Sequence, residues 1–313
     1  MSCYHPMIAY RSATLSDNGK RPLVFGARGA YTDLPVYVPC GRCIGCRLEK
    51  ARQWAVRCMH EAQMWDRNCF VTLTYNDDNL PIDRSVNKRE MQLFMKRLRK
   101  EYGEGIRFYG CGEYGSKLGR PHYHMLLFNH DFPDKEVWKA QKARGYKGRY
   151  IIDEFTLYRS ESLERLWPYG FSTIGDVTFE RAIYRARYVT KKIYGEMAEG
   201  YYDGRIPEFA MMSRGNAKTG PQGIGRTWIE KYGSDVYPKD FFTMKGRRLK
   251  PPKYYDTVLE NEDPELYKKI KNEREVKAIE DRKVNGPSRL IEREKYKLNQ
   301  ITRLRRSLEN EKS

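Results

Sequence analysis

Apolar residues recur at helical spacing in two segments of the first hundred residues. In GCRLEKARQWAVRCMHEAQMW, residues 45–65, the apolar positions follow one another at steps of three and four: Leu48, Ala51, Ala55, Cys58, Ala62 and Trp65. This spacing predicts one amphipathic helix. A second, basic helix is predicted in NKREMQLFMKRLRKEYG, residues 87–103, where Gly103 marks the end.

Runs rich in β-branched and aromatic residues predict strands between and after these helices. CFVTLTY, residues 69–75, is such a run, and the turn residues NDDNLP close it. IRFYGCGEYG (106–115) and PHYHMLLF (121–128) are two more, joined by a short loop, so a hairpin is predicted. A further short strand is expected in YGFSTIGDV, residues 169–177, followed by a helix from Thr178 to Gly195.

The other segments carry weaker patterns. We expect a polar, irregular insertion at 130–168 and a loop-rich region at 200–255. Residues 264–313 predict two charged helices separated at Gly286 and Pro287, with apolar residues at heptad-like spacing in the second. A solvated tail and a helix that pairs or contacts DNA explain this pattern equally well.

These elements predict an α+β protein with a central, mostly antiparallel sheet and flanking helices. The expected division is a cysteine-rich N-terminal segment with its amphipathic helix (1–66), a sheet domain (67–255) and a charged helical C-terminal tail (256–313).

The net charge of the chain points to a polyanionic partner. It has 59 Lys and Arg against 41 Asp and Glu, a formal net charge of +18. Neutralising phosphates releases counterions, so nucleic acid is the leading partner and an anionic membrane surface the second, against an ordinary basic surface with neither. The 24 tyrosines suit stacking on unpaired bases. No apolar run approaches the roughly 20 residues that span a bilayer, and the polar start is unlike a signal peptide, so we expect an intracellular protein.

Two histidines in the predicted hairpin are candidate metal ligands. Side chains at i and i+2 of a strand share a face, so His122 and His124 point the same way and Tyr123 points to the other side. Glu113, at the end of the preceding strand, is a third candidate. Nitrogen and oxygen ligands with open positions suit Mg²⁺ or Mn²⁺ acting on phosphate. The alternative is that both histidines are packing residues.

The predicted helix 178–195 has two different faces. Apolar residues gather on one side, and the opposite side presents Tyr184, Tyr188 and Lys191, flanked by Lys192. A phenol has a pKa near 10 and is a poor nucleophile at neutral pH unless cations stabilise the phenolate. The lysines and a divalent ion would do so. The alternative is that both tyrosines only cover the outer face of the helix.

Three of the seven cysteines lie in one short motif. Cys40, Cys43 and Cys46 are spaced C-x-x-C-x-x-C, which suits zinc in a reducing compartment. Cys3, His5 and Cys58 are candidates for a fourth ligand. Four thiolates would leave no open position, so the site would be structural. An iron–sulfur cluster and three reduced, packed cysteines are the alternatives. Cys69 and Cys111 lie in predicted strands and are expected in the core.

The order and spacing of these motifs resemble the HUH-type rolling-circle replication initiators, and most of all the Rep proteins of microviruses of the gokushovirus type. The resemblance covers roughly residues 1–255. It is carried by these motifs in order: VPCGRCIGCR followed by RQWAVRC, then FVTLTY, GEYG with RPHYHMLLF, and YRARYVTKK.

The resemblance implies an RRM-like palm and a specific chemistry. A metal held by His122, His124 and an acidic residue, for which Glu113 is the candidate, polarises the scissile phosphate, and a tyrosine attacks it. Tyr188 is the first choice for the initial attack and Tyr184 the second nucleophile, with Lys191 and Lys192 beside them. The products are a 5′-phosphotyrosine link and a free 3′-OH that primes replication.

The resemblance also implies the surroundings of this chemistry. The substrate would be single-stranded origin DNA of a phage genome, the partners the host helicase and polymerase, and the location the host bacterial cytoplasm. It selects Cys3 as the fourth ligand of a zinc knuckle, because CYHP opens the resembling proteins too. Two alternatives stay open: an HUH transposase or relaxase with the same chemistry, and a non-enzymatic zinc-containing DNA- or RNA-binding regulator.

Overall fold

The computed structural model describes most of the chain as two compact units, one of residues 1–50 with 265–313 and the other of residues 51–264. The described residues are 3–17, 19–115, 119–142, 154–177, 200–215, 223–244 and 246–309. The predicted helix 178–195, with Tyr184, Tyr188, Lys191 and Lys192, lies outside them. Among the described helices, none is long and apolar enough to cross a membrane.

The first unit contains a small antiparallel sheet and two long helices. The sheet has the order β2-β1-β3, formed by Leu23–Val24, Met7–Ser12 and Ala30–Val38. The helices are α8 (Pro264–Val284) and α9 (Pro287–Glu309). The two charged helices predicted for the C-terminal segment are therefore confirmed, with the break at Gly286 and Pro287, because proline lacks the N–H that would continue α8.

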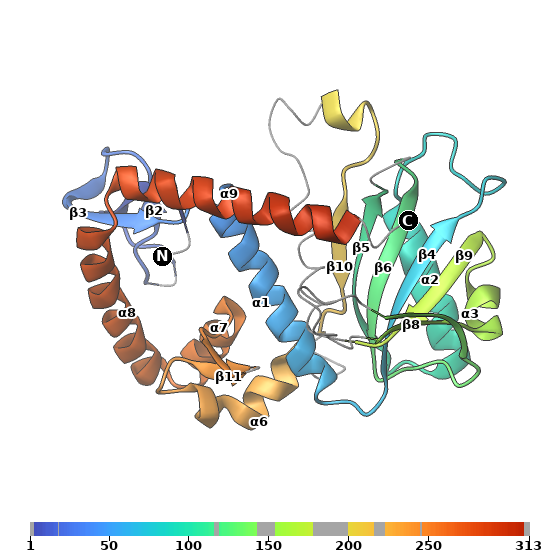
Figure 1. The fold of residues 1–313 in the computed structure, drawn as a ribbon. Helices are drawn as coiled ribbons and strands as arrows, with labels where there is room; N and C mark the ends of the chain where they lie inside the picture. Colours follow the sequence, from blue (N-terminus) through green and yellow to red (C-terminus); the bar gives the residue numbers. More distant parts are fainter. Residues whose placement is uncertain are drawn as a thin grey trace. The chain divides into compact units, whose positions relative to one another are not determined.

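The second unit is built on a seven-stranded sheet in which every neighbouring pair is antiparallel (Figure 1). The strand order is β10-β5-β6-β4-β9-β8-β7. In chain order the strands are β4 (Asn68–Tyr75), β5 (Arg107–Tyr114), β6 (Pro121–Phe128), β7 (Glu136–Lys142), β8 (Glu154–Arg159), β9 (Gly170–Gly175) and β10 (Phe209–Met212). The predicted α+β class, antiparallel sheet and β5–β6 hairpin are confirmed.

Helices α2 (Lys88–Tyr102) and α3 (Glu161–Leu166) pack on one face of this sheet. α2 begins at the Asn87 cap and ends at Gly103, whose φ of 104° lies in the left-handed region. The buried side chains of α2 recur at helical spacing and meet the inward residues of the central strands: Met91, Phe94, Met95 and Leu98 against Val71, Leu73, Met125 and Leu127. This face holds the larger core.

Helix α1 (Ile44–Ala62) packs on the opposite face of the sheet through residues of the second unit. Its small side chains Ala51, Ala55 and Cys58 face Phe70, Tyr109, Leu126 and Phe128. Alanines let the helix backbone approach the sheet closely, so this core is shallow. It involves the β5 and β6 positions nearer Arg107 and Phe128, which leaves the other end of these strands for the site described below.

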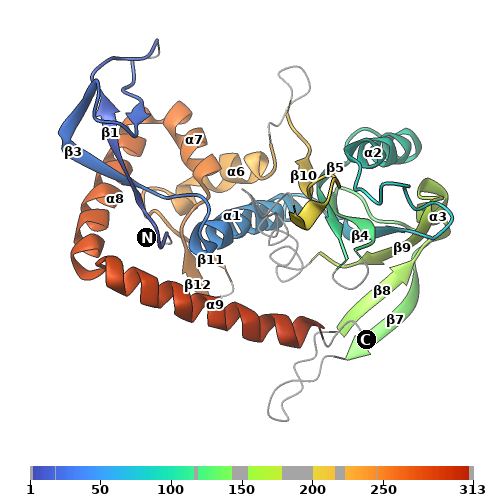
Figure 2. The same cartoon turned by 90° about the horizontal axis from the view of Figure 1, so that it is seen from above.

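Two sequence expectations were wrong. The segment expected to be an irregular insertion contains β7, β8 and α3, and Figure 2 shows β7 and β8 extending one end of the sheet. The segment expected to be loop-rich contains α6 (Arg226–Val236), α7 (Lys253–Glu262) and the hairpin β11 (Phe242–Met244) and β12 (Arg247–Leu249). The periodicity failed because β7 is polar and α6 contains Gly233 and a kink at Tyr232.

An aromatic stack connects α6 and α7 to α1. The His60 ring lies on the Trp228 ring with centroids 3.5 Å apart. His60 Nδ1 lies 2.9 Å from the Tyr255 hydroxyl. Burial lowers the pKa of His60 to about 3, because the charged imidazolium would lose its hydration. His60 is therefore a neutral core residue at physiological pH.

Candidate metal centre

The hairpin register brings the three candidate ligands of the sheet together. Glu113 of β5 lies directly opposite His122 of β6, and Cys111 lies opposite His124. Directly opposed residues share a face of the sheet, as do residues two apart on one strand. Glu113, His122 and His124 therefore lie on one face, although nine positions separate Glu113 from His122.

The distances within this cluster suit a divalent ion. Glu113 Oε1 lies 2.8 Å from His122 Nε2 and 2.9 Å from His124 Nε2. The three ligand atoms all lie within 4.8 Å of one another. Octahedral Mg²⁺ holds oxygen ligands at about 2.1 Å, which places neighbouring ligand atoms about 3 Å apart. The cluster therefore fits a small ion with little rearrangement.

The hydrogen bond of the other ring nitrogen determines the tautomer of His122. Its Nδ1 lies 3.0 Å from the Arg120 carbonyl oxygen, which can only accept, so Nδ1 carries the proton. A neutral imidazole has one N–H, so Nε2 then carries a lone pair that faces the Glu113 carboxylate oxygen. Two acceptors at 2.8 Å require a proton or a cation between them. The same arrangement presents histidine to metals in proteins.

His124 is oriented by the neighbouring strand. Its Nδ1 lies 3.0 Å from Thr72 Oγ1 on β4, which leaves Nε2 directed at Glu113. Sequence reasoning missed Thr72, although Thr72 and Thr74 alternate with the apolar Val71, Leu73 and Tyr75, a pattern that marks a polar end on this strand face. That alternation was the available signal.

Burial and charge shape the electrostatics of the cluster. Glu113 is 2% exposed and His124 6% exposed, whereas His122 is 15% exposed and forms the open side. Burial raises the pKa of the Glu113 carboxyl, but the charges and hydrogen bonds of His124 and His122 outweigh burial and hold the pKa below its usual range. An ionised carboxylate in a mostly buried cluster favours a bound cation.

An exposed aromatic residue lies in the same row of the sheet. Thr74 of β4 pairs with His122 on one side and with Phe171 of β9 on the other, so Phe171 shares the face of the metal ligands. Its backbone is two strands, about 10 Å, from that of His122. The Phe171 side chain is 62% exposed. Sequence reasoning missed this residue because the strand register decides its neighbours.

The cysteines gather in the first unit. The sulfur atoms of Cys3, Cys40, Cys43 and Cys46 all lie within 4.8 Å of one another. The two other candidates for a fourth ligand lie elsewhere: Cys58 packs in the core beneath the sheet, and His5 contacts Glu294. Burial raises the pKa of the Cys40 thiol, but the backbone N–H groups of Cys43 and Arg42 outweigh it, and the pKa falls to about 7. Cys69 and Cys111 are buried in strands, as expected.

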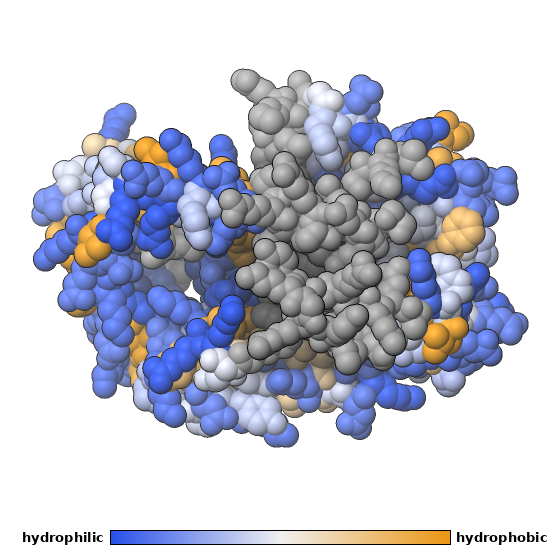
Figure 3. Space-filling view, viewed as in Figure 1, coloured by the Kyte–Doolittle hydropathy of each residue, from blue (hydrophilic) through white to orange (hydrophobic). Residues whose placement is uncertain are grey.

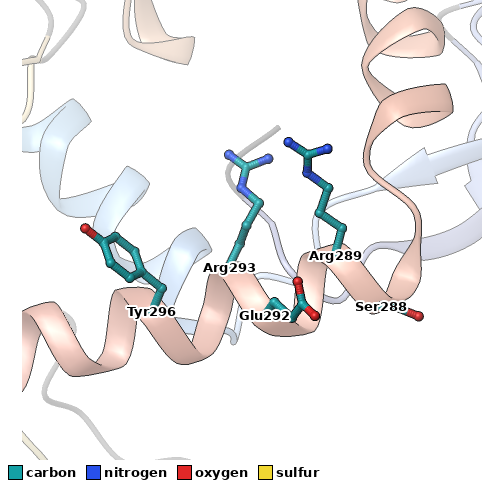
Figure 4. Close-up of a pocket in the computed structure, with 5 residues that line it drawn as sticks. All are labelled: Ser288, Arg289, Glu292, Arg293 and Tyr296. Atoms are coloured by element: carbon teal, nitrogen blue, oxygen red, sulfur yellow. The ribbon is translucent and has the colours of Figure 1, made fainter.

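A shallow pocket of about 630 Å³ along α9 contains none of the predicted site residues. Its lining comes from one helix, with the two arginines extending side by side (Figure 4): Ser288, Arg289, Glu292, Arg293 and Tyr296. A single helix face lacks converging side chains from other elements, so this pocket is not a candidate for the chemistry.

Comparison with known proteins supports the replication reading of the site. The family model of the replication-associated protein ORF2 matches residues 68–193, which include the Glu113, His122 and His124 cluster and the segment with both candidate tyrosines. The replication-associated protein VP4 of Bdellovibrio phage phiMH2K is 31% identical over 277 residues, 85% of this chain and 80% of that protein. No solved structure matches the chain.

Two further relatives carry names of the same kind. The replication-associated protein ORF2 of Spiroplasma virus 4 is 34% identical over 242 residues, 72% of this chain and 68% of that protein. The replication-associated protein ORF4 of Chlamydia phage 1 is 29% identical over 230 residues, 71% of this chain and 53% of that protein.

The fold and site define an α+β protein with a candidate centre of two histidines and one glutamate on an antiparallel sheet. Such a centre suits a divalent ion that acts on phosphate. The chain belongs to the family of phage replication-associated proteins, the microvirus type of Rep.

Proposed function

We propose that this protein initiates replication by cutting single-stranded DNA at the origin of a phage genome. The observation that carries the proposal is the direct approach of His122 Nε2 and Glu113 Oε1 at 2.8 Å, with Nδ1 already committed to a carbonyl oxygen. This arrangement calls for a cation, and a cation beside an open sheet face suits phosphate chemistry. The relatives named replication-associated proteins support the same role.

In the proposed reaction, His122, His124 and Glu113 hold Mg²⁺ or Mn²⁺, which when bound polarises the scissile phosphate and offsets its developing charge. The Tyr188 oxygen attacks phosphorus and gives up its proton. The bond to the 3′ oxygen breaks, and that oxygen takes up a proton to leave a free 3′-OH. The DNA 5′ end stays on the tyrosine as a phosphodiester.

Tyr184 serves as the second nucleophile in this proposal. It would attack the next phosphate while the first link is reversed, so that strands are rejoined. Lys191 and Lys192 would stabilise the phenolates. The matching family model spans all four of these residues, which supports their assignment to the same reaction.

The face around the centre suits a single strand. The exposed Phe171 ring offers a flat surface in the row of His122, and stacking on aromatic rings is available to every base. The net charge of +18 favours binding to the phosphate backbone. Figure 3 shows predominantly hydrophilic residues over the described part of the surface in that view.

The proposal includes the setting in which the protein acts. A free 3′-OH at a nick is a primer, so the host helicase and polymerase are the partners that would extend it, in the bacterial cytoplasm where the phage genome is copied. The four-cysteine cluster lies in the other unit and is not needed for this chemistry.

The test is covalent capture of DNA. Labelled oligonucleotides that tile both strands of the genome encoding the chain are incubated with Mn²⁺, and an adduct that survives denaturation is sought. We expect an adduct at one locus. It should be absent in Tyr184→Phe/Tyr188→Phe and retained in the control Tyr201→Phe, which alters an exposed tyrosine outside the proposed set.

Each other outcome rejects part of the proposal. An undiminished adduct in the double variant would refute the nucleophile assignment. Tight DNA binding without any adduct would favour the non-enzymatic zinc-containing regulator. Adducts at many unrelated loci, or only at element ends or a transfer origin, would favour a transposase or relaxase.

A further inference from the structure

We propose that Cys3, Cys40, Cys43 and Cys46 form a structural zinc site that holds the first unit together. This inference is independent of the proposed nicking reaction. The matching family model begins at residue 68, after all four cysteines, and the names of the relatives mention no metal.

The sulfur positions match a tetrahedral zinc site. Cys3 Sγ lies 3.9 Å from Cys43 Sγ, and Cys40 Sγ lies 4.0 Å from Cys46 Sγ. Zinc–sulfur bonds of about 2.3 Å place the corners of a tetrahedron about 3.8 Å apart. A disulfide would bring two sulfurs to about 2.05 Å. The four thiols therefore have the spacing of ligands around one ion.

Backbone N–H groups point at the sulfur atoms. Cys40 N donates to Cys3 Sγ at 3.3 Å, Cys43 N donates to Cys40 Sγ at 3.3 Å, and Tyr4 N donates to Cys43 Sγ at 3.4 Å. Four thiolates and one Zn²⁺ carry a net charge of about −2, and such donors spread that charge. Zinc-binding loops need this support for their sulfurs.

The local backbone is arranged for the motif. Gly41 has a φ of 75°, which turns the chain between Cys40 and Cys43, and a side chain there would be strained. Cys46 lies in the first turn of α1, where the helix N-terminus favours negative charge. Cys3 precedes β1, so the site joins the N-terminal strand, the end of β3 and the start of α1.

The first unit has little apolar core to stabilise it. Among its residues whose burial is described, the buried apolar side chains are Cys3, Ala9 and Ile270. β3 is exposed along most of its length. Small units without an adequate core need a metal, a disulfide or a partner to fold. The zinc site supplies that stabilisation, and with four thiolates it leaves no open position for catalysis.

The test uses the full chain, purified under reducing conditions with any affinity tag removed. Elemental analysis should find about one zinc per chain. Replacement with Co²⁺ should produce sulfur-to-cobalt charge-transfer bands and the intense d–d bands of a tetrahedral thiolate site. Cys40→Ala/Cys43→Ala should lose both, and the control Cys69→Ala, which removes a buried thiol from β4, should keep both.

Folding of the variants is checked separately. All five tryptophans lie in residues 51–264, so their fluorescence reports the second unit alone. A native spectrum in the double variant, together with new protease cleavage within residues 1–50, supports a staple of the first unit. Reduced wild-type protein that binds neither zinc nor cobalt overturns the proposal, as does iron with sulfide, or zinc retained by the double variant.

Discussion

His122 Nε2 and Glu113 Oε1 face each other across two neighbouring strands at 2.8 Å, while the other nitrogen of the His122 ring binds the Arg120 carbonyl oxygen. The pair is thus poised for a cation. Because the strand register creates this approach, substitutions can separate the contributions of charge, orientation and substrate contact.

Removing the charge of Glu113 should weaken metal binding most. Glu113→Gln keeps the shape of the side chain but replaces an ionised oxygen with an amide, which is a poor ligand for Mg²⁺ or Mn²⁺. We expect Mn²⁺ affinity to fall by more than about 100-fold, measured by titration calorimetry, since loss of an outer partner alone costs about 10–100-fold. The exposed Glu104→Gln should bind Mn²⁺ as the wild type does; equal affinities in the two variants would contradict the assignment.

The orientation of His124 can be tested from the neighbouring strand. Thr72→Val removes the hydroxyl that meets His124 Nδ1 and retains the volume of the side chain. Mn²⁺ affinity should fall about 10-fold or more, because the ring loses the partner that directs Nε2 at the metal. Thr173→Val alters the residue opposite Thr72 on β9, one strand further from the histidines, and is the matched control. Similar losses in both variants would indicate a general packing effect.

Phe171 should contribute to DNA binding without affecting the metal. Stacking on one base is worth about 1–3 kcal/mol, so Phe171→Ala should weaken single-stranded DNA binding about 5- to 150-fold. Phe171→Trp should retain binding, and Mn²⁺ affinity should be unchanged in both. Fluorescence anisotropy with a short oligonucleotide measures the effect. The control is Ile82→Ala at another exposed apolar side chain, and a wild-type affinity in Phe171→Ala would remove this residue from the DNA path.

Stability of the second unit should fall as the pH drops below the range of ordinary histidine. Burial lowers the pKa of His60 to about 3 and that of His130 to about 4, from 6.5. Between about pH 6.5 and about pH 4 the unfolded chain binds protons that the folded chain does not, so the free energy of unfolding decreases with falling pH. Each histidine contributes up to about 1.4 kcal/mol per pH unit.

Denaturant unfolding followed by tryptophan fluorescence at about pH 7 and about pH 5 measures this loss. His60→Phe retains a ring on Trp228 and should lessen the pH dependence, since only His130 of the pair still titrates in the unfolded chain. A free energy of unfolding that is equal at both pH values would contradict the inference.

Much of the architecture was readable from local pattern. The strands at 69–75, 106–115 and 121–128, the helix ended by Gly103 and the break before α9 follow from periodicity and turn residues, which act within a few positions along the chain. Local pattern missed α3, α6, β7 and β8, because short polar or kinked elements are held by tertiary contacts, as Ser160 and Ser162 of α3 are by Asp134.

The sequence by itself determined that His122 and His124 share a strand face, because the side-chain period of a strand is two. It also determined that three closely spaced cysteines can bind one ion. Only the tertiary structure decided that Glu113 lies opposite His122, that Thr72 orients His124, and that Cys3 joins the other cysteines. These relationships depend on strand register and chain closure over distance, where a one-residue slip would reverse every face.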